Sequence, residues 1–312
     1  MSRRRQAGVG LIEVLISASI GLLLVVAAAR LYVTSTVNRQ IQSEIEGLQQ
    51  NARHALGQLV RDTRRSGYFG GSIDLSPLSG TEAPLPPDGS CSTTNNSWGR
   101  MLQRPLYGID DGREGYDCIP GKEYLRGDLL VVRYADPLPV QAIDPQRLYL
   151  KSAATGGRLF AGRDRGHAAN SLEGGNAATR TLVARAYYIR QSSSVLCPDG
   201  SRPPSLYREY LGSRGLPLSE EIAAGIENLQ IQYGVSGSSG DSIRLVDADG
   251  VEAWDSVVLV QLWLLARQEC AHAGMQAKRR QFGMGSRTYV PANPAYHREL
   301  FQATVMLRNP AP

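Results

Sequence analysis

An apolar run begins with Gly8-Val9-Gly10-Leu11-Ile12-Glu13-Val14-Leu15-Ile16 and continues to Ala29. From Val9 to Ala29 the 21 residues carry a single charge, Glu13. As a helix rising about 1.5 Å per residue, this run is about 31 Å long, which matches the hydrocarbon thickness of a bilayer. The run therefore predicts a membrane-spanning helix.

A short basic segment, residues 1–8, precedes the run. Its Arg3-Arg4-Arg5 supplies three of the five net positive charges of the 312-residue chain, so the basic balance is weak support for nucleic-acid binding. By the positive-inside rule these arginines keep the N-terminus in the cytoplasm and place the rest outside it. A cleaved secretory signal is the alternative, because Ala27-Ala28-Ala29 resembles its cleavage site. The brevity of the basic segment and the position of Glu13 argue against that alternative.

Glu13 is the unusual residue of this run. An ionisable side chain at the bilayer centre costs roughly 2.5–3.5 kcal/mol on insertion scales, and less near the end of a helix. The bland interpretation is a carboxylate that reaches the headgroups. We favour a functional role, because intramembrane carboxylates usually have one.

A helical pattern continues past Arg30. Apolar or small residues recur in steps of four and three at Ile41, Ile45, Leu48, Ala52, Ala55 and Leu59. No proline interrupts the chain from Val9 to Arg65, so we expect one helix to about Ser66, with Gly67 as its C-cap. The stripe predicts packing against the body of the same chain, with a homomeric coiled coil as the alternative.

The rest of the chain predicts a β-rich body. Apolar or alternating segments predict strands at residues 128–134, 181–190, 205–211, 227–233, 254–266 and 300–307. The segment 254–266 is apolar on both faces, which favours a central strand beneath the helix. Asp249-Gly250 predicts a hairpin-like turn. Residues 68–125, 153–179 and 270–298 are expected to be long loops.

Two sets of residues resemble one known superfamily. Residues 8–16, with the basic segment before them and the apolar run after them, resemble the type III signal of type IV pilins and type II secretion pseudopilins. The body segments 128–134, 226–234, 254–267 and 301–309 resemble the PilW family of minor pilins. The implied fold is α+β: a long N-terminal helix, half in the membrane and half amphipathic, packed on a mostly antiparallel sheet. The implied parts are a leader (1–8), a membrane and fibre-core half-helix (9–33), an amphipathic half-helix (34–67) and a globular body (68–312).

The resemblance also implies how the N-terminus is processed. A prepilin peptidase would cut between Gly8 and Val9, the new amine of Val9 would be methylated, and Glu13 would be the assembly carboxylate. Val9 stands where the family usually has Phe. The freed amine of one subunit and Glu13 of its neighbour carry opposite charges, and such a buried pair selects register more than it adds stability.

The implied function is that of a minor pilin that primes type IV pilus assembly in a tip complex and supports adhesion or twitching motility. Implied partners are the prepilin peptidase, other minor pilins, the major pilin, the inner-membrane assembly platform, a tip adhesin and the lipid bilayer. The protein would be a single-pass inner-membrane protein with a periplasmic body, and later part of the pilus. A minor pseudopilin of type II secretion, a membrane-anchored periplasmic enzyme or binding protein, and a DNA-binding minor pilin are the alternatives.

Four cysteines, at positions 91, 118, 197 and 270, would lie outside the cytoplasm, where disulfides persist. Four cysteines allow three pairings. We favour Cys91–Cys118, which closes a local loop, and assign Cys197–Cys270 by elimination. Zinc is the rival interpretation, but the spacing of Cys-x-x-Cys is missing.

Catalytic motifs are missing from the sequence. The histidines at positions 54, 167, 272 and 297 are scattered, and no nucleophile elbow, phosphate loop or His-Glu-x-x-His occurs. Residues 247–252 resemble part of a calcium loop. The first and last ligand positions of such a loop would fall on Leu245 and Ser256, so we interpret the segment as a turn. Residues 278–280 form a small basic patch, which we interpret as a solvated loop. We therefore expect no enzyme activity, no cofactor and no metal.

Overall fold

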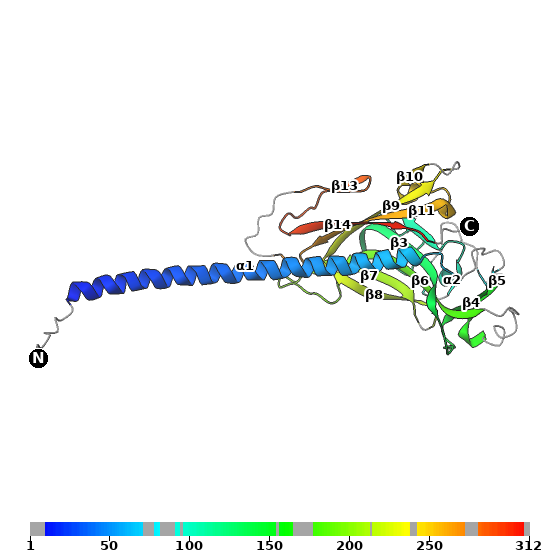
Figure 1. Cartoon of the computed structure of the whole chain (residues 1–312), viewed down its shortest axis with the longest axis horizontal. Coiled ribbons are helices and arrows are strands. Elements are labelled where there is room, and N and C mark those ends of the chain that lie inside the picture. The colour runs from blue at the N-terminus through cyan, green and yellow to red at the C-terminus, as the bar shows by residue number, and fades with distance from the viewer. Residues whose placement is uncertain are drawn as a thin grey trace, which may run out of the picture. The chain divides into compact units, whose positions relative to one another are not determined.

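A computed structural model describes residues 10–70, 78–81, 91–93, 96–153, 156–164, 177–212, 214–237, 242–271 and 280–308. The chain divides into two compact units, Met1–Gly47 and Leu48–Pro312. One helix, α1 (Leu11–Arg65), contributes residues to both (Figure 1). The long uninterrupted helix predicted from the apolar run and the stripe is confirmed over this range.

The end of α1 follows the expected capping chemistry. Arg64 and Arg65 lie in its last turn, where cations interact favourably with the helix dipole. Gly67 has a φ of 76°, in the left-handed region, and its N–H donates to the carbonyl oxygen of Arg133 at 3.1 Å. The glycine therefore ends the helix and turns the chain onto the sheet.

The larger sheet of the body has eight strands. These are β1 (Leu78–Ser79), β2 (Leu106–Ile109), β3 (Tyr124–Pro139), β4 (Leu148–Ala153), β5 (Gly156–Ala161), β6 (Ala178–Gln191), β7 (Pro204–Leu211) and β8 (Pro217–Ala224). The main order is β1-β5-β4-β6-β3-β2, and β7 and β8 continue from β6. All these pairs are antiparallel except the short β1–β5 pair, so the mostly antiparallel sheet is confirmed.

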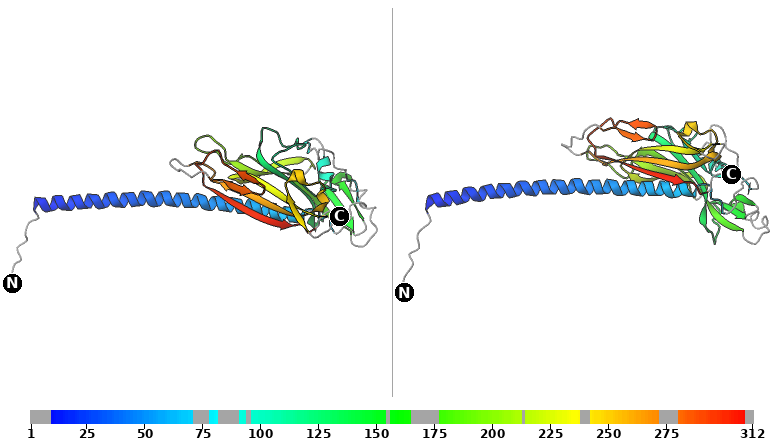
Figure 2. Two further views of the ribbon diagram at one scale, coloured as in Figure 1. Left: turned by 90° about the horizontal axis from the view of Figure 1, so that it is seen from above. Right: turned by 45° about the horizontal axis from the view of Figure 1, so that its top comes forward.

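A second sheet has four strands in the order β10-β9-β11-β14 (Figure 2). These are β9 (Ile226–Ser236), β10 (Ile243–Val246), β11 (Val257–Arg267) and β14 (Arg298–Met306). All three pairs are antiparallel. A separate hairpin joins β12 (Phe282–Met284) to β13 (Arg287–Tyr289). The remaining elements are α2 (Ser97–Arg100) and the 3₁₀ turns η1 (Gly162–Asp164), η2 (Ala248–Gly250) and η3 (Trp254–Ser256).

The main core lies between the two sheets and the last turns of α1. Leu48, Ala52, Ala55 and Leu59 of the stripe are buried in one cluster with residues of β3, β6, β9 and β11. Strand β11 also sends Trp263 into a second cluster with the β12–β13 hairpin. The predicted central strand is therefore buried on both faces, as its composition indicated.

Several local expectations were wrong. The turn at Asp249-Gly250 exists as η2, but β10 pairs with β9 and not with β11, so it closes no hairpin. Both edges of β11 are paired, with β9 and β14, so β10 pairs with the outer edge of β9 instead. The segment 153–179 contains β5, 270–298 contains β12 and β13, and 68–125 contains β1, α2 and β2. The start of segment 254–266 is the 3₁₀ turn η3 rather than strand.

Candidate functional site

The first turn of α1 carries the predicted assembly carboxylate. The carbonyl oxygen of Gly10 accepts hydrogen bonds from the N–H groups of Glu13 at 3.0 Å and Val14 at 3.2 Å. The hydroxyl of Ser17 donates to the carbonyl oxygen of Glu13 at 2.7 Å. The Glu13 side chain is exposed, and its negative charge suits the N-terminal end of a helix. Gly8 and Val9 lie outside the described residues.

The surface of α1 from Leu11 to Val37 is largely apolar and is not covered by other described residues. Large apolar residues from Leu11 to Val37 are exposed, with Leu11 at 79% and Leu23 at 70%. The helix is long and apolar enough to cross a membrane, and none of its most apolar window is buried. Exposing so much apolar surface to water is unfavourable, so this surface needs lipid or other helices around it.

In the body, one buried carboxylate fastens α1 to the larger sheet. Asp62 is 1% exposed and accepts a hydrogen bond from the hydroxyl of Tyr134 at 2.9 Å. The Nη1 atom of Arg185 lies 2.8 Å and 2.7 Å from its two oxygens, and the hydroxyl of Tyr187 donates to it as well. Tyr134 belongs to β3, and the other two belong to β6. Asp62 therefore joins the helix to two neighbouring strands.

The charges in this cluster are fixed by its surroundings. Burial, together with the adjacent Asp62, raises the pKa of Tyr134 to about 12, and it raises the pKa of Tyr187 in the same way. Burial alone would lower the pKa of Arg185, but the charge of Asp62 raises it above its ordinary value. Both hydroxyls therefore stay neutral donors at neutral pH, and the guanidinium stays charged.

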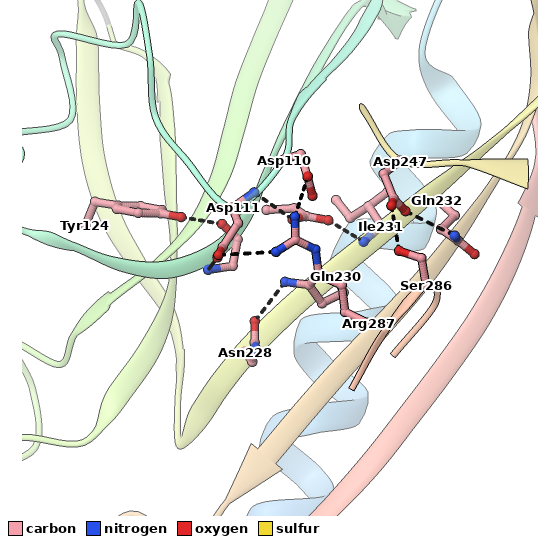
Figure 3. Close-up of polar contacts among 12 residues, drawn as sticks. Asp110, Asp111, Tyr124, Asn228, Gln230, Ile231, Gln232, Asp247, Ser286 and Arg287 are labelled. Atoms are coloured by element: carbon pink, nitrogen blue, oxygen red, sulfur yellow. Dashed lines mark hydrogen bonds and ion pairs between the residues drawn. The ribbon is translucent and has the colours of Figure 1, made fainter. Parts of the chain in front are cut away.

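A second polar cluster lies where the β2–β3 connection meets β9 and the β12–β13 hairpin (Figure 3). Asp128 accepts hydrogen bonds from the backbone N–H groups of Asp111 at 3.0 Å and Ile231 at 2.6 Å. Arg287 of the hairpin pairs with Asp110 and lies 3.5 Å from Asp111. Burial raises the pKa of Asp128 to about 8, although both backbone bonds oppose the shift.

The same cluster holds the β12–β13 hairpin in place. Ser286 in the hairpin turn donates to Asp247, which also accepts from Gln232 at 3.0 Å (Figure 3). In the part of the chain that the structure describes, no group of three His, Cys, Asp or Glu residues is arranged to hold a metal ion. Through their contacts with Ser286 and Arg287, these acidic residues fasten the hairpin, which covers Trp263 of β11.

Two disulfides close loops of the body. Cys91 is bonded to Cys118, 27 residues away, and Cys197 to Cys270, 73 residues away. Both pairs agree with those expected from the sequence. His54 is exposed on α1, and His297 lies just before β14, far from it in the chain. The other histidines, at positions 167 and 272, and the basic residues at 278 and 279 lie outside the described residues.

Asp62 and Asp128 were not singled out from the sequence. Asp62 had a signal: it lies three residues after Leu59, so it occupies the next position of the apolar stripe. A carboxylate on the buried face of a helix requires partners in the body. Asp128 opens a predicted buried strand, but its partners come from residues 111 and 231, which no local pattern connects.

Comparisons with known proteins give two family matches. Residues 186–309 match the family described as Type IV Pilus-assembly protein W, and residues 3–29 match the Prokaryotic N-terminal methylation motif. No curated protein matches the sequence. A solved type IV-like pilin, TTHA1219 from Thermus thermophilus, is 14% identical over 66% of this chain and 85% of its own, with a TM-score of 0.29.

Proposed function

We propose that this chain, a member of the PilW family of type IV pilin-like proteins, works as a minor pilin that primes pilus assembly within a tip complex. Its partners would be the prepilin peptidase, other minor pilins, the major pilin and the inner-membrane assembly platform, with adhesion or twitching motility as the outcome. It would first lie in the inner membrane with its N-terminus in the cytoplasm and its body in the periplasm. The role is structural and requires no catalysis by the chain.

One observation carries the proposal: a single helix, α1, has two surfaces with different requirements. Its first unit exposes apolar side chains around one carboxylate, Glu13. Its last turns are buried in the β-rich body through Leu48, Ala52, Ala55 and Leu59. A membrane anchor alone would need only the apolar surface, and the carboxylate would then make insertion into the bilayer less favourable.

The carboxylate acquires a use when subunits pack. Cleavage after Gly8 would free the amine of Val9, and that cation needs a counter-charge in a low-dielectric fibre core. Glu13 of a neighbouring subunit would supply it as the helices stack with an axial offset. Leaving one partner of a buried pair alone costs about 3–5 kcal/mol, so the pair would select one stacking over others.

The mass of the mature N-terminus tests the proposal directly. The protein is extracted from membranes of cells with an active prepilin peptidase, and its N-terminal peptide is measured by mass spectrometry. Loss of residues 1–8 together with one added methyl group is the expected result. An intact Met1, or loss of the whole apolar run, would contradict it and favour a simple anchor or a secretory signal.

A minor pseudopilin of type II secretion would pass the same test, so the system needs its own measurement. The PilW-family match supports the pilus. Cross-linking in intact membranes, followed by identification of subunits bound to the body, separates the two. Pilus subunits are the expected result, and secretion-system subunits would overturn the assignment.

A further inference from the structure

Strand β14 forms an open edge of the four-stranded sheet. It pairs with β11 through nine consecutive residue pairs without a register shift, and it pairs with no other strand among the described residues. An open edge presents unpaired N–H and C=O groups that can bind a further strand. Such edges are normally shortened, bent or protected by charges or proline.

Charges protect only the start of β14, at Arg298 and Glu299. Leu300 to Leu307 contains no charged residue, proline or glycine. The outer strand of the other sheet, β8, is protected: it begins with Pro217, carries Glu220 and Glu221, and pairs with β7 through a register shift. The other outer strands, β1, β2 and β10, have two to four residues. Among the described strands, β14 is therefore the long regular edge that is left open.

Strand β10, the opposite edge of the same sheet, has exposed apolar side chains and a charge opposite to that of Glu299 on β14. Ile243 and Leu245 of β10 are 50% and 42% exposed. Arg244 between them is exposed and has no partner among the described residues. At the other edge, Glu299 of β14 accepts a hydrogen bond from Gln49 and makes no ion pair within the described part of the chain. Within the described residues, one edge therefore carries a cation that makes no ion pair, and the other edge carries a carboxylate.

The direction of the strands sets how two copies can meet. The order β10-β9-β11-β14 contains three antiparallel pairs, so β10 and β14 run in opposite directions. A second copy moved sideways without rotation would bring its β10 beside β14 as an antiparallel partner. The helical segments of the two bodies would then run in the same direction, as they must when both chains are anchored in one membrane.

The side chains agree with this pairing. Val246 of β10 faces the core that contains α1, so Arg244 lies on the same side of the sheet. Glu299 lies opposite Ala266, which also faces that core. On the other side of the sheet, Leu245 of β10 shares a face with Leu300 of β14, which lies opposite Leu265 and packs at the border of the cluster beneath the β12–β13 hairpin. Directly opposed residues in antiparallel strands share a face, so the contact of Leu245 with Leu300 and that of Arg244 with Glu299 can form in the same pairing.

We propose that β14 accepts β10 of a second copy of this chain lying in the same direction. Leu245 of the copy would lie opposite Leu300, and Arg244 of the copy would lie opposite Phe301 and diagonal to Glu299. The two sheets would form one continuous sheet of eight strands, held by backbone hydrogen bonds, an apolar pair and a charge pair. The inference rests on the body alone and goes beyond the proposed role in pilus assembly.

Charge exchange tests the pairing in the full chain, purified in detergent micelles. We expect Arg244→Glu and Glu299→Arg each to weaken self-association at least about threefold, because a favourable surface pair becomes a repulsive one. Mixing the two variants should restore association between them, since the acid introduced at position 244 of one then faces the base introduced at position 299 of the other. Sedimentation of one fluorescently labelled variant with the other unlabelled measures this. Failure of the mixture to associate more tightly than either variant alone would overturn the proposal.

Cysteine cross-linking tests the register. The native cysteines form two disulfides, so only introduced thiols are free to react. Chains with Leu245→Cys are mixed with chains carrying Leu300→Cys and oxidised mildly, and a disulfide-linked dimer is expected. Leu218→Cys, on the protected edge β8 and 49% exposed, replaces Leu300→Cys as the matched control. Equal yields from the two mixtures, or a monomeric wild-type chain at high concentration, would overturn the proposal.

Discussion

Removing the carboxylate of Asp62 should destabilise the body more than removing any exposed acid of α1. The Asp62→Ala substitution leaves Arg185 without its counter-charge and leaves the hydroxyls of Tyr134 and Tyr187 without an acceptor. Asp62→Asn removes the charge but keeps one oxygen that can accept a hydrogen bond. The two variants therefore separate the charge from the hydrogen bonds.

The structure sets the size of the effect. Breaking a buried pair costs about 3–5 kcal/mol, and the Arg185 side chain is 24% exposed, which favours the low end of about 3 kcal/mol. Each hydroxyl that loses its acceptor adds about 1 kcal/mol. We therefore expect Asp62→Ala to lower the free energy of unfolding by about 5 kcal/mol and Asp62→Asn to lower it by about 2–3 kcal/mol.

Denaturant unfolding of the full chain in detergent, followed by tryptophan fluorescence, measures these differences. All three tryptophans, at positions 98, 254 and 263, lie in the body, so the signal reports on the body. Glu46→Ala, at an exposed position of α1, is the matched control and should change the free energy by less than about 0.5 kcal/mol. A loss of less than about 1 kcal/mol for Asp62→Ala would refute the reasoning.

Three other perturbations have defined outcomes. Glu13→Val should leave membrane insertion and leader cleavage intact but abolish incorporation into fibres, as measured by immunoblotting of sheared pili; wild-type incorporation would contradict the role of the carboxylate. The pKa of Asp128 is raised to about 8, so between about pH 4 and pH 8 the folded state keeps a proton that the unfolded state has released. As the pH rises through this range, the free energy of unfolding of the wild type should therefore fall by about 1.4 kcal/mol per pH unit relative to that of Asp128→Asn. Unfolding curves at pH 5 and pH 8 measure this, and a constant difference would contradict it. Replacing Cys91 and Cys118 by serine should cost about 3.5 kcal/mol of unfolding free energy, from the closure entropy of a 27-residue loop, and denaturation without reductant is the assay; a change below about 1 kcal/mol would contradict that estimate.

The sequence predicted the elements whose own residues form a clear apolar pattern, either a helical repeat or a continuous run. The apolar run and the stripe predicted α1, because a helix repeats its buried face every three to four residues. The runs at 128–134 and 254–266 predicted β3 and β11, because strands buried on both faces are continuously apolar, although β11 begins three residues later than predicted. In each case the signal lies within the element and needs no knowledge of its neighbours.

The missed elements depend on their neighbours instead. Strand β5 contains two glycines and an arginine, and strand β8 contains two glutamates, so neither looks like a strand alone. Each forms because an antiparallel partner next to it in the chain, β4 or β7, supplies the hydrogen bonds. The hairpin expected at Asp249-Gly250 is missing because β11 pairs with β9 and β14 and has no free edge for β10.

The apolar stripe of α1 does not by itself fix the position of the helix along the sheet. A slip of four residues in one direction would place Leu56, Leu59 and Thr63 where Ala52, Ala55 and Leu59 lie, so the core would still receive two leucines. A slip in the other direction would place Asn51 where Ala55 lies. Such a slip would place Gln58 or Ser66 where Asp62 lies, and neither can neutralise the guanidinium of Arg185. The buried charge therefore excludes the slipped arrangements by an amount comparable with the loss in Asp62→Ala. A subunit whose helix must pack against other helices needs this single register, and an uncharged core would supply stability without it.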